Sequence, residues 1–307
     1  MSQQTITITA FNRPHYFEQL LSSLVKNNLN GWMIYMQIEP SNKVEEFKAI
    51  AHALLAKDQF QIEINQTRLG VRQNPYKLLT KVFQQGSLLN IYLEEDMVVS
   101  SDLTQMATWY QMLDHTDQLC LNLMFAGCFS SGFLSTPECP SLLVKSKCFN
   151  SLGFILTKQQ WQTHFASNWL RFPEFFTNIN GDQVDGWDCA IYDYLLSKPE
   201  LKVVSPLLAR ANHIGKDDGS YCTEDFHITS FDNLPIYQGE SQHLDYSITD
   251  NYNTLPYAVK AHLNLWREMT QSLITLKKFI TPIRKLQKKL WFVKKIMSTR
   301  LFKKIIT

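Results

Sequence analysis

The feature that most constrains this chain is an apolar run that ends in three consecutive carboxylates, Glu94, Glu95 and Asp96. The run occupies residues 88–93, and a second short apolar run follows at residues 97–99. Three adjacent acids repel one another and resist burial, so the tip of a core strand tolerates them only beside positive charge. A divalent cation supplies such charge, because hard cations bind carboxylate oxygens. The triplet therefore indicates the edge of a metal and diphosphate site, with a solvated acidic turn as the alternative.

The residues before the triplet alternate between strand-like and helix-like patterns. The expected elements are a strand at 5–11, a helix from Pro14, a strand at 32–38, a helix at about 44–57, a strand at 60–64, a helix at 75–85 and a strand at 88–93. This order predicts an α/β fold with a mainly parallel sheet and helices on both faces. Polar residues that follow the strands should then converge on one edge, where open α/β sheets bind ligands.

The second half is less regular. We expect helices at 103–113 and 158–168, strands at 119–125, 152–156 and 201–208, a loop at 127–140, acids followed by a helix at 182–196, and a linker at 233–256. Ser100, Ser101 and Asp102 offer oxygens that could cap the helix beginning at residue 103. Neither GxGxxG nor GxxxxGK[ST] occurs, which argues against a dinucleotide-binding Rossmann site and a P-loop.

Composition describes an ordinary globular protein, with 307 residues, 45% hydrophobic and 19% charged. The six cysteines form no CxxC pair, so neither a zinc site nor a disulfide framework is indicated. The chain opens without a signal-like segment and contains no apolar run long enough for a membrane span. These observations predict reduced cysteines and a cytoplasmic protein.

The charge is distributed unevenly. Eleven of the 30 basic residues lie at 277–307 and no acid follows Glu268, so the rest of the chain is acidic. In this tail, apolar residues recur every three or four positions at Phe279, Ile283, Leu286, Leu290, Val293, Met297 and Leu301. The pattern predicts a basic amphipathic helix that lies on an anionic membrane surface, or one that packs on its own domain. The acidic body argues against nucleic acid as a partner.

Five short segments carry a family resemblance: TAFNRP at 9–14, IEP at 38–40, the acidic motif at 91–100, LGF at 152–154 and GWD at 186–188. Together they resemble the GT-A glycosyltransferases of the family 2-like group, and also the N-acetylglucosaminyltransferase that begins complex N-glycans. The similarity covers roughly residues 5–230. The acidic motif is its most specific part, and this chain has Glu94, Glu95 and Asp96 where an Asp-rich triplet is more usual.

The resemblance implies a Rossmann-like GT-A fold and a nucleotide-sugar donor bound with Mn²⁺ or Mg²⁺, with UDP as the expected nucleotide. Asp96 would hold the cation, with Glu94 and His213 as further ligands, while His227 is a weaker candidate and His213 could be an ordinary loop residue. The loop position of Arg68 and Arg72 suggests nucleotide contacts or salt bridges to the acids. The donor-binding candidates are Ala10, Phe11, Asn12, Arg13, Glu39, Arg68, Arg72, Asn74, Glu94 and Glu95.

An acceptor alcohol must lose its proton as it attacks the sugar, and a carboxylate can serve as the base. Asp188 is the first choice, Asp185 the second and Asp182 the third, and in-line attack would invert the anomeric centre. The structural alternatives are a helix N-cap for Asp185 and a favourable partner of the helix dipole for Asp188.

The expected organisation is a catalytic domain at 1–232, with a nucleotide-binding half at 1–103 and an acceptor half at 104–232. A linker and helix follow at 233–276, and the membrane-associating tail at 277–307. The leading hypothesis is a metal-dependent glycosyltransferase on the inner face of a bacterial membrane, which extends a surface polysaccharide or a glycolipid. The alternatives are a non-catalytic, membrane-associated saccharide-binding protein and a sugar-nucleotide nucleotidyltransferase, although the latter normally has a Gly-rich first loop and residues 11–14 contain no glycine.

Overall fold

The computed structural model describes residues 4–126, 133–171, 175–177, 183–185, 187–217, 222, 224–239, 244–249, 251, 253, 255–257, 259–261, 263–264, 268 and 271. The chain divides into two compact units, Met1–Lys260 and Ala261–Thr307. The tail predicted at 277–307 lies outside the described residues, as do Asp182 and residues 127–132 of the predicted loop. No helix among the residues that the structure describes is long and apolar enough to span a membrane.

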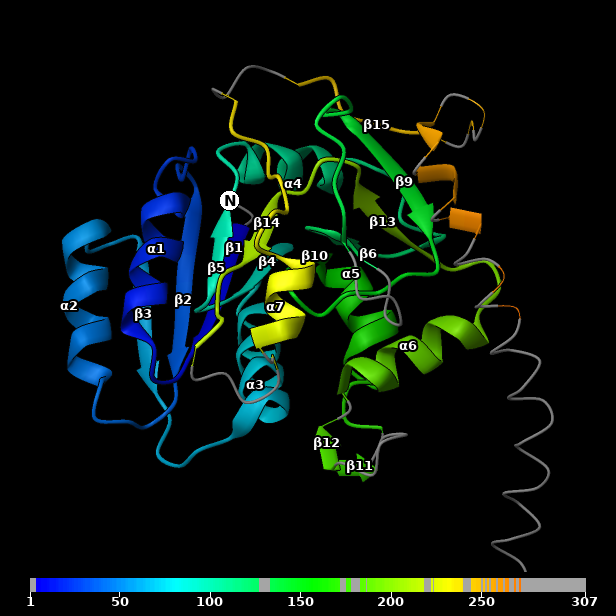
Figure 1. Ribbon diagram of the computed structural model, residues 1–307. Helices are drawn as coiled ribbons and strands as arrows, with labels where there is room; N and C mark the ends of the chain where they lie inside the picture. The colour runs from blue at the N-terminus through cyan, green and yellow to red at the C-terminus, as the bar shows by residue number, and fades with distance from the viewer. Residues whose placement is uncertain are drawn as a thin grey trace, which may run out of the picture. The chain divides into compact units, whose positions relative to one another are not determined.

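The first unit is built on a nine-stranded sheet with the order β15-β9-β13-β6-β10-β4-β1-β2-β3 (Figure 1). Its strands are β1 (Gln4–Ala10), β2 (Trp32–Ile38), β3 (Phe60–Ile64), β4 (Leu89–Glu94), β6 (Gln118–Asn122), β9 (Leu142–Ser146), β10 (Phe154–Thr157), β13 (Lys202–Pro206) and β15 (Ser247–Ile248). β3, β2, β1 and β4 are parallel, whereas β10 runs antiparallel between β4 and β6 and β9 runs antiparallel to β13. The predicted α/β class with a mainly parallel sheet is confirmed.

Three short strand pairs lie outside this sheet. They are β5 (Met97–Val99) with β14 (Ala211–His213), β7 (Phe125–Ala126) with β8 (Phe133–Leu134), and β11 (Phe175–Thr177) with β12 (Gln183–Asp185). The sequence analysis expected no strand at β9 or β14, because both are short and neither has a clear alternating pattern. β14 matters most for the site, since it pairs with the strand that follows the acidic triplet.

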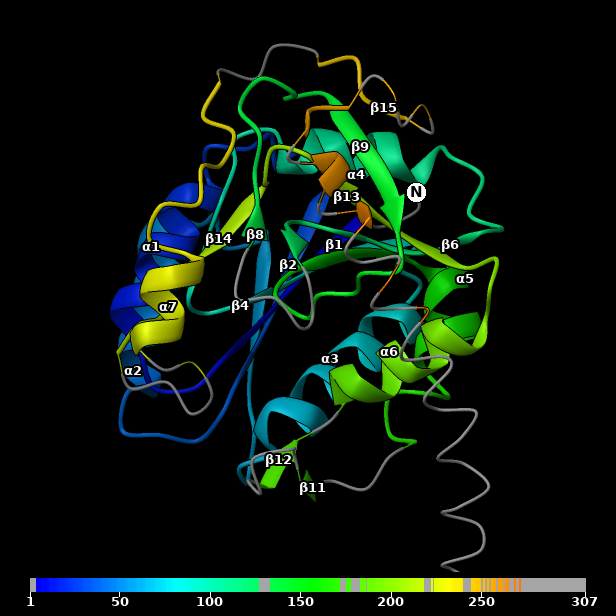
Figure 2. The same ribbon diagram turned by 45° about the vertical axis from the view of Figure 1, so that its right-hand side comes forward.

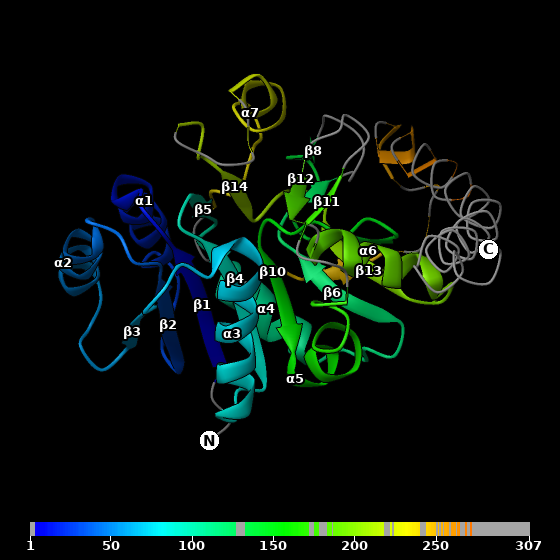
Figure 3. The ribbon, with the colours of Figure 1, turned by 90° about the horizontal axis from the view of Figure 1, so that it is seen from below.

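Helices cover both faces of the sheet, with α1 and α2 on one side of the parallel strands and α3 on the other (Figures 2 and 3). The helices are α1 (Pro14–Leu24), α2 (Val44–Leu54), α3 (Gly70–Gln84), α4 (Leu103–Gln111), α5 (Lys158–Gln160), the π-helical turn η1 (Trp161–Phe165), α6 (Trp187–Ser197) and α7 (Glu224–Ser230). Pro14 begins α1 as expected, because a missing N–H costs nothing at the first helical position.

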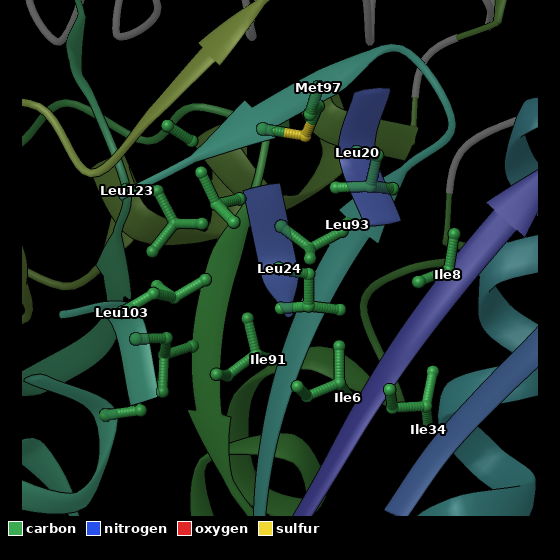
Figure 4. Packing of buried hydrophobic residues seen from close by; sticks show 14 of the residues in the cluster. Ile6, Ile8, Leu20, Leu24, Ile34, Ile91, Leu93, Met97, Leu103 and Leu123 are labelled. Carbon is green, nitrogen blue, oxygen red and sulfur yellow. The ribbon is translucent and has the colours of Figure 1, made fainter. Parts of the chain in front are cut away.

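The two faces of the central sheet have different chemistry. Alternate residues of a strand point to opposite faces, and on β1 the buried Ile6 and Ile8 join the apolar core with Leu20 and Leu24 of α1 (Figure 4). The intervening threonines bond to β4 on the other face, for example Thr5 Oγ1 to Asn90 Oδ1 at 2.8 Å. Tight apolar packing on one face and paired polar groups on the other fix the register of β1, and with it the position of the strand ends.

The helix predicted at 75–85 begins five residues earlier, at Gly70, with Pro75 inside it. The reason is tertiary, because the Glu39 carboxylate accepts hydrogen bonds from the backbone N–H groups of Leu69 and Gly70 and so satisfies the start of the helix. Arg72 and Asn74 therefore lie in a helix and not in the predicted loop. This corrects the sequence-based placement of both residues.

The described residues of the segment predicted as a linker at 233–256 belong to the first unit. β15 adds to the edge of the large sheet beside β9, and Ile236 forms a bridge with Ala209. Asp102 makes no capping hydrogen bond to α4, contrary to expectation, because its carboxylate binds Arg210 Nε at 2.8 Å and Tyr246 Oη at 2.8 Å. The hydrogen bond from Tyr246 thus ties this C-terminal segment to Asp102, which lies between β5 and α4 and also forms a buried ion pair with Arg210.

Candidate functional site

The acidic triplet lies at the carboxyl edge of the parallel strands. Glu94 of β4 lies opposite Thr9 of β1, and Ala10 of β1 lies opposite Ile38 of β2. The loops that follow these three strands therefore begin side by side, as the alternation of strands and helices predicted. Ala10 itself is buried in the core, so only its backbone can reach a ligand.

Arg13 reaches two of the three acids. Its Nε donates to Glu95 Oε1 at 2.9 Å, and its Nη2 donates to Asp96 Oδ2 at 2.6 Å. The other Glu95 oxygen accepts a hydrogen bond from the Phe11 backbone N–H at 2.6 Å. Asn12, which lies between Phe11 and Arg13 in the chain, is half-buried. The two carboxylate side chains are only 5% and 4% exposed. The chain thus supplies from its own first loop much of the positive charge that the triplet requires.

His213, at the end of β14, lies against the third acid, while its role as a metal ligand stays a prediction. In the β5–β14 pair Met97 lies opposite His213, and the next residue, Ile214, donates its N–H to the Asp96 carbonyl at 2.8 Å. This pairing places His213 Nε2 3.0 Å from Asp96 Oδ2. His227 lies behind it, with Nε2 3.1 Å from the His213 carbonyl oxygen, which places His227 next to His213 and not on the acids.

Glu94 differs from Glu95 and Asp96 in its hydrogen-bond partner, which is a tyrosine, and in its pKa, which is raised to about 7. It accepts a hydrogen bond from Tyr92 Oη at 3.0 Å, and Tyr92 Oη in turn lies 3.0 Å from Thr9 Oγ1. Burial, and then the charge of Asp96, raise the pKa of Glu94 to about 7. The sequence analysis missed Tyr92, although its position two residues before Glu94, on the same face of β4, was a signal that could have identified it.

Asp96 is the acid best suited to bind a cation. Burial acts to raise its pKa, but the hydrogen bond from His213 and the charges of His213 and Arg13 lower that pKa to about 2, so the carboxylate is ionised near neutral pH. Its Oδ1 is buried and has no hydrogen-bond partner among the residues that the structure describes. An ionised carboxylate with an unused oxygen, beside an imidazole, is a donor set that fits Mn²⁺ or Mg²⁺.

Among the residues that the structure describes, the protein side chains do not form a complete coordination shell. In the described part of the chain, no group of three or more His, Cys, Asp and Glu residues has the spacing of a metal site. Mg²⁺ is commonly held by one or two carboxylates, water and the phosphates of a substrate. The side chains present are therefore compatible with a cation that arrives together with a phosphate ligand.

Glu39, predicted to contact the nucleotide base, is buried and already bonded. Its carboxylate accepts the Gly70 N–H at 2.7 Å, the Leu69 N–H at 3.0 Å and the Asn65 side-chain amide at 3.1 Å. These bonds hold the start of α3 against the end of β2. Its position at the carboxyl edge agrees with the prediction, while the contact with a base stays a prediction.

The other predicted donor-binding residues separate into exposed and buried groups. Arg68 is exposed, and its guanidinium lies 4.3 Å from the centre of the Phe11 ring. Arg72 and Asn74 are buried in α3, and the Asn74 side-chain oxygen accepts a hydrogen bond from Asn65 at 2.9 Å. Arg68 and Phe11 are therefore the members of this group that best present themselves to a ligand.

Asp188, the first choice for the base, lies in the first turn of α6. Its Oδ1 accepts the N–H of the next residue, Cys189, at 2.7 Å, and an acid in the first turn of a helix is favoured by the helix dipole. Burial raises the pKa of Asp188, which makes the carboxylate more basic. Asp185 ends β12, so its backbone is in a strand and not at the predicted N-cap, and its side chain lies outside the described atoms.

A stacked pair of tryptophans brings the start of α6 to the same edge of the sheet. The rings of Trp169 and Trp187 are 3.8 Å apart with an interplanar angle of 6°. Trp169 Nε1 donates to the Arg72 carbonyl at 2.9 Å, in the first turn of α3. Since Asp188 follows Trp187 directly, this contact links the candidate base to the helix whose start Glu39 holds. The sequence analysis missed this contact, because stacking between residues 18 positions apart leaves no periodic signal.

Comparisons with known proteins found similar structures but no similar sequence family. No protein-family profile matches the chain, and no curated protein sequence matches it. Among solved structures, Staphylococcus aureus TarS 1–349 in complex with UDP-GlcNAc has 14% identity and a TM-score of 0.44 over 74% of this chain and 64% of that chain. The mannosyltransferase PcManGT from Pyrobaculum calidifontis, in complex with GDP-Man and Mn²⁺, has 9% identity and a TM-score of 0.44 over 71% and 58%.

A third match is the glycosyltransferase GlyE of Streptococcus pneumoniae TIGR4, with 14% identity and a TM-score of 0.44 over 75% of this chain and 60% of that chain. The chain spans less than two thirds of the length of each of these three proteins. These similarities are low. The functional conclusion therefore depends on the geometry at the carboxyl edge of the sheet.

Proposed function

We propose that this chain is a GT-A glycosyltransferase that moves a sugar from a UDP-linked nucleotide-sugar donor to a saccharide or glycolipid acceptor. The observation that carries the proposal is the convergence of Arg13, Glu95, Asp96 and His213 at the carboxyl edge of the sheet. An ionised acid with an unused oxygen, next to an arginine in the first loop, suits the recognition of a diphosphate together with a divalent cation.

The donor would lie across the ends of β1, β2 and β4. The exposed Arg68 and the half-buried Phe11 ring beneath it offer a stacking surface for the nucleobase. Asp96 and His213 would hold Mn²⁺ or Mg²⁺, with Glu94 as a further ligand. Bound there, the cation would supply positive charge where the diphosphate leaving group develops negative charge.

The residues of this chain supply the proton acceptor. The acceptor hydroxyl oxygen forms a bond to the anomeric carbon, the bond from that carbon to the diphosphate oxygen breaks, and the hydroxyl proton passes to Asp188. The raised pKa of Asp188 favours this role. Attack from the side opposite to the leaving group inverts the anomeric centre, and Asp185 is the second candidate for the base.

The test of the site is Asp96→Ala, assayed as Mn²⁺-dependent hydrolysis across a panel of nucleotide sugars. We expect at least a roughly hundredfold loss of hydrolysis, because charge stabilisation at the leaving group is lost. The matched control is Asp117→Ala, which removes a carboxylate from a partly exposed ion pair with Lys145. Full activity in Asp96→Ala would overturn the assignment of the site.

The same assay separates the alternatives. A nucleotidyltransferase would release pyrophosphate and not a nucleoside diphosphate. A non-catalytic saccharide-binding protein would bind a sugar ligand and turn over no donor. Either result would replace the glycosyltransferase proposal.

The proposed setting is the inner face of a bacterial membrane, in the synthesis of a surface polysaccharide or a glycolipid. The support is the composition of residues 277–307, which carry 11 basic residues and no acid. Deletion of these residues should move the protein from anionic vesicles into the supernatant in a sedimentation assay. Unchanged sedimentation would reject the peripheral membrane role while leaving the enzyme proposal intact.

A further inference from the structure

Arg13 and a divalent cation would both bind the same carboxylate oxygen, Asp96 Oδ2. Arg13 Nη2 is 2.6 Å from Asp96 Oδ2, which the proposed function assigns to the cation. His213 Nε2 shares that oxygen at 3.0 Å. A guanidinium at this position would repel a dication that approaches the same carboxylate. The structure therefore contains a competitor for the cation that belongs to the protein itself.

The contacts of Arg13 favour an exchangeable ion pair over a permanent one. Its side chain is 14% exposed, so the guanidinium keeps a route to solvent. Asp96 Oδ1 has no hydrogen-bond partner among the described residues. Arg13 therefore neutralises the charge of the carboxylate but leaves one of its two oxygens without a hydrogen bond. Glu95 is bonded independently to the Phe11 N–H at 2.6 Å and would retain that bond if Arg13 moved.

The chain also passes very close to this pair. A Cβ atom added at Gly215 would collide with the Asp96 carboxylate and with Arg13 Nη1. Tyr16 Oη donates to Asp217 Oδ2 at 3.0 Å, which holds this segment against α1. Residues 214–217 therefore confine the space in which Arg13 and a cation can both approach Asp96.

We propose that Arg13 is the resident counter-ion of the acidic turn, and that a divalent cation must displace it from Asp96 in order to bind. The inference rests on the proposed function. In the absence of donor, Arg13 pairs with Glu95 and Asp96 and holds metal affinity low. A donor diphosphate, which carries negative charge, would give the released guanidinium a new partner, so cation and nucleotide should bind in a mutually favourable way.

The test is direct titration of Mn²⁺ in the absence of nucleotide, followed by electron paramagnetic resonance or calorimetry, with the full chain. We expect Arg13→Gln to bind Mn²⁺ about tenfold more tightly than the wild type, and Arg13→Lys to lie between the two, because lysine cannot bridge both acids with one planar group. The matched control is Lys48→Gln, which removes a positive charge from an exposed ion pair on α2 and should leave Mn²⁺ affinity unchanged.

Equal or weaker Mn²⁺ binding by a folded Arg13→Gln overturns the inference. If Arg13→Gln fails to fold, the comparison of Arg13→Lys with the wild type decides in the same way. Absence of Mn²⁺ binding by all the proteins also overturns it. Donor hydrolysis in the presence of EDTA then separates the two proposals, since metal-free turnover would preserve the glycosyltransferase assignment and remove only the role of Arg13 as a competitor.

Discussion

Two buried arginine–aspartate pairs lie on either side of β5, and they differ in how completely they are satisfied. Before the strand, Asp96 binds Arg13 and His213 through one oxygen, while the other has no described partner. After the strand, both oxygens of Asp102 are used: Ser100 Oγ donates to Oδ1 at 2.6 Å, and Arg210 Nε and Tyr246 Oη each donate to Oδ2 at 2.8 Å.

The arginines repeat this difference. Arg210 is fully buried and also donates to the backbone carbonyls of Leu208 and Pro140, so its charge is enclosed by fixed partners. Arg13 is partly exposed and forms ion pairs with two side chains of the acidic turn, Glu95 and Asp96, while its guanidinium also lies 5.7 Å from the centre of the Tyr16 ring. A pair in which every group is bonded fixes structure, whereas a pair with an unused buried acceptor retains free energy that a ligand can recover. Hydrogen-bond satisfaction thus distinguishes the Asp102 pair, whose partners are complete, from the Asp96 pair, which could still bind a ligand.

The largest expected effect is on stability, from Asp102→Ala. The substitution leaves the Arg210 charge buried without its carboxylate, so the free energy of unfolding should fall by about 3–5 kcal/mol. Urea unfolding followed by circular dichroism measures this loss. The matched variant is Asp96→Ala, for which we expect a clearly smaller loss because Arg13 can turn toward solvent. Similar losses of unfolding free energy in the two variants would show that the Asp96 and Asp102 pairs do not differ in their contribution to stability.

A smaller effect is expected in the pH dependence of stability. The pKa of Glu94 is raised to about 7 in the folded protein, from 4.5, so the folded state binds a proton more tightly than the unfolded chain. The Glu94 contribution should therefore lower the free energy of unfolding as pH rises from about 4.5 to 7, by roughly 3 kcal/mol.

This pH effect is isolated by comparing the wild type with Glu94→Gln in metal-free buffer containing EDTA. The glutamine cannot ionise, so its stability should fall less over the same interval. Parallel pH profiles for the two proteins would show that the acidic turn is not electrostatically strained, and the contrast with the Asp102 pair would then rest on hydrogen bonds alone.

The smallest expected effect comes from Tyr246→Phe, which removes one of three donors to Asp102 and keeps the ring. The free energy of unfolding should fall by about 1–2 kcal/mol, and hydrolysis of the nucleotide-sugar donor should be retained. Urea unfolding and the hydrolysis assay test both parts. A loss of hydrolysis without a loss of stability would indicate that the Asp102 pair acts on the site and is not purely structural.

Much of the first half of the fold could be read from the sequence. β1, β2, β3 and β4 have β-branched or apolar runs, and the helices between them repeat apolar residues every three or four positions, so each element carries its own local signal. The start of α3 at Gly70 could not be predicted in this way, because it depends on the carboxylate of Glu39, which is distant in the chain. β14 and β15 are also defined by their partners, since strands of two or three residues carry little pattern of their own.

The candidate site was predictable as a set of residue types and not as a set of contacts. Glu94, Glu95 and Asp96 were identified as acids that need positive charge, and a divalent cation was the expected source. The structure adds Arg13, which provides charge at Glu95 and Asp96 before any ligand binds. It also places His213 on Asp96 through the β5–β14 pair, which no local pattern encodes.

The sequence by itself determined the succession of strands and helices along the first half of the chain. It also determined the presence of three acids at the end of a core strand, because side-chain polarity and spacing act locally. Only the tertiary structure decided which groups neutralise those acids. Hydrogen bonds and ion pairs depend on distances between residues such as Arg13 and Asp96, which are 83 positions apart in the chain, and those distances are fixed by the register of β1 against β4.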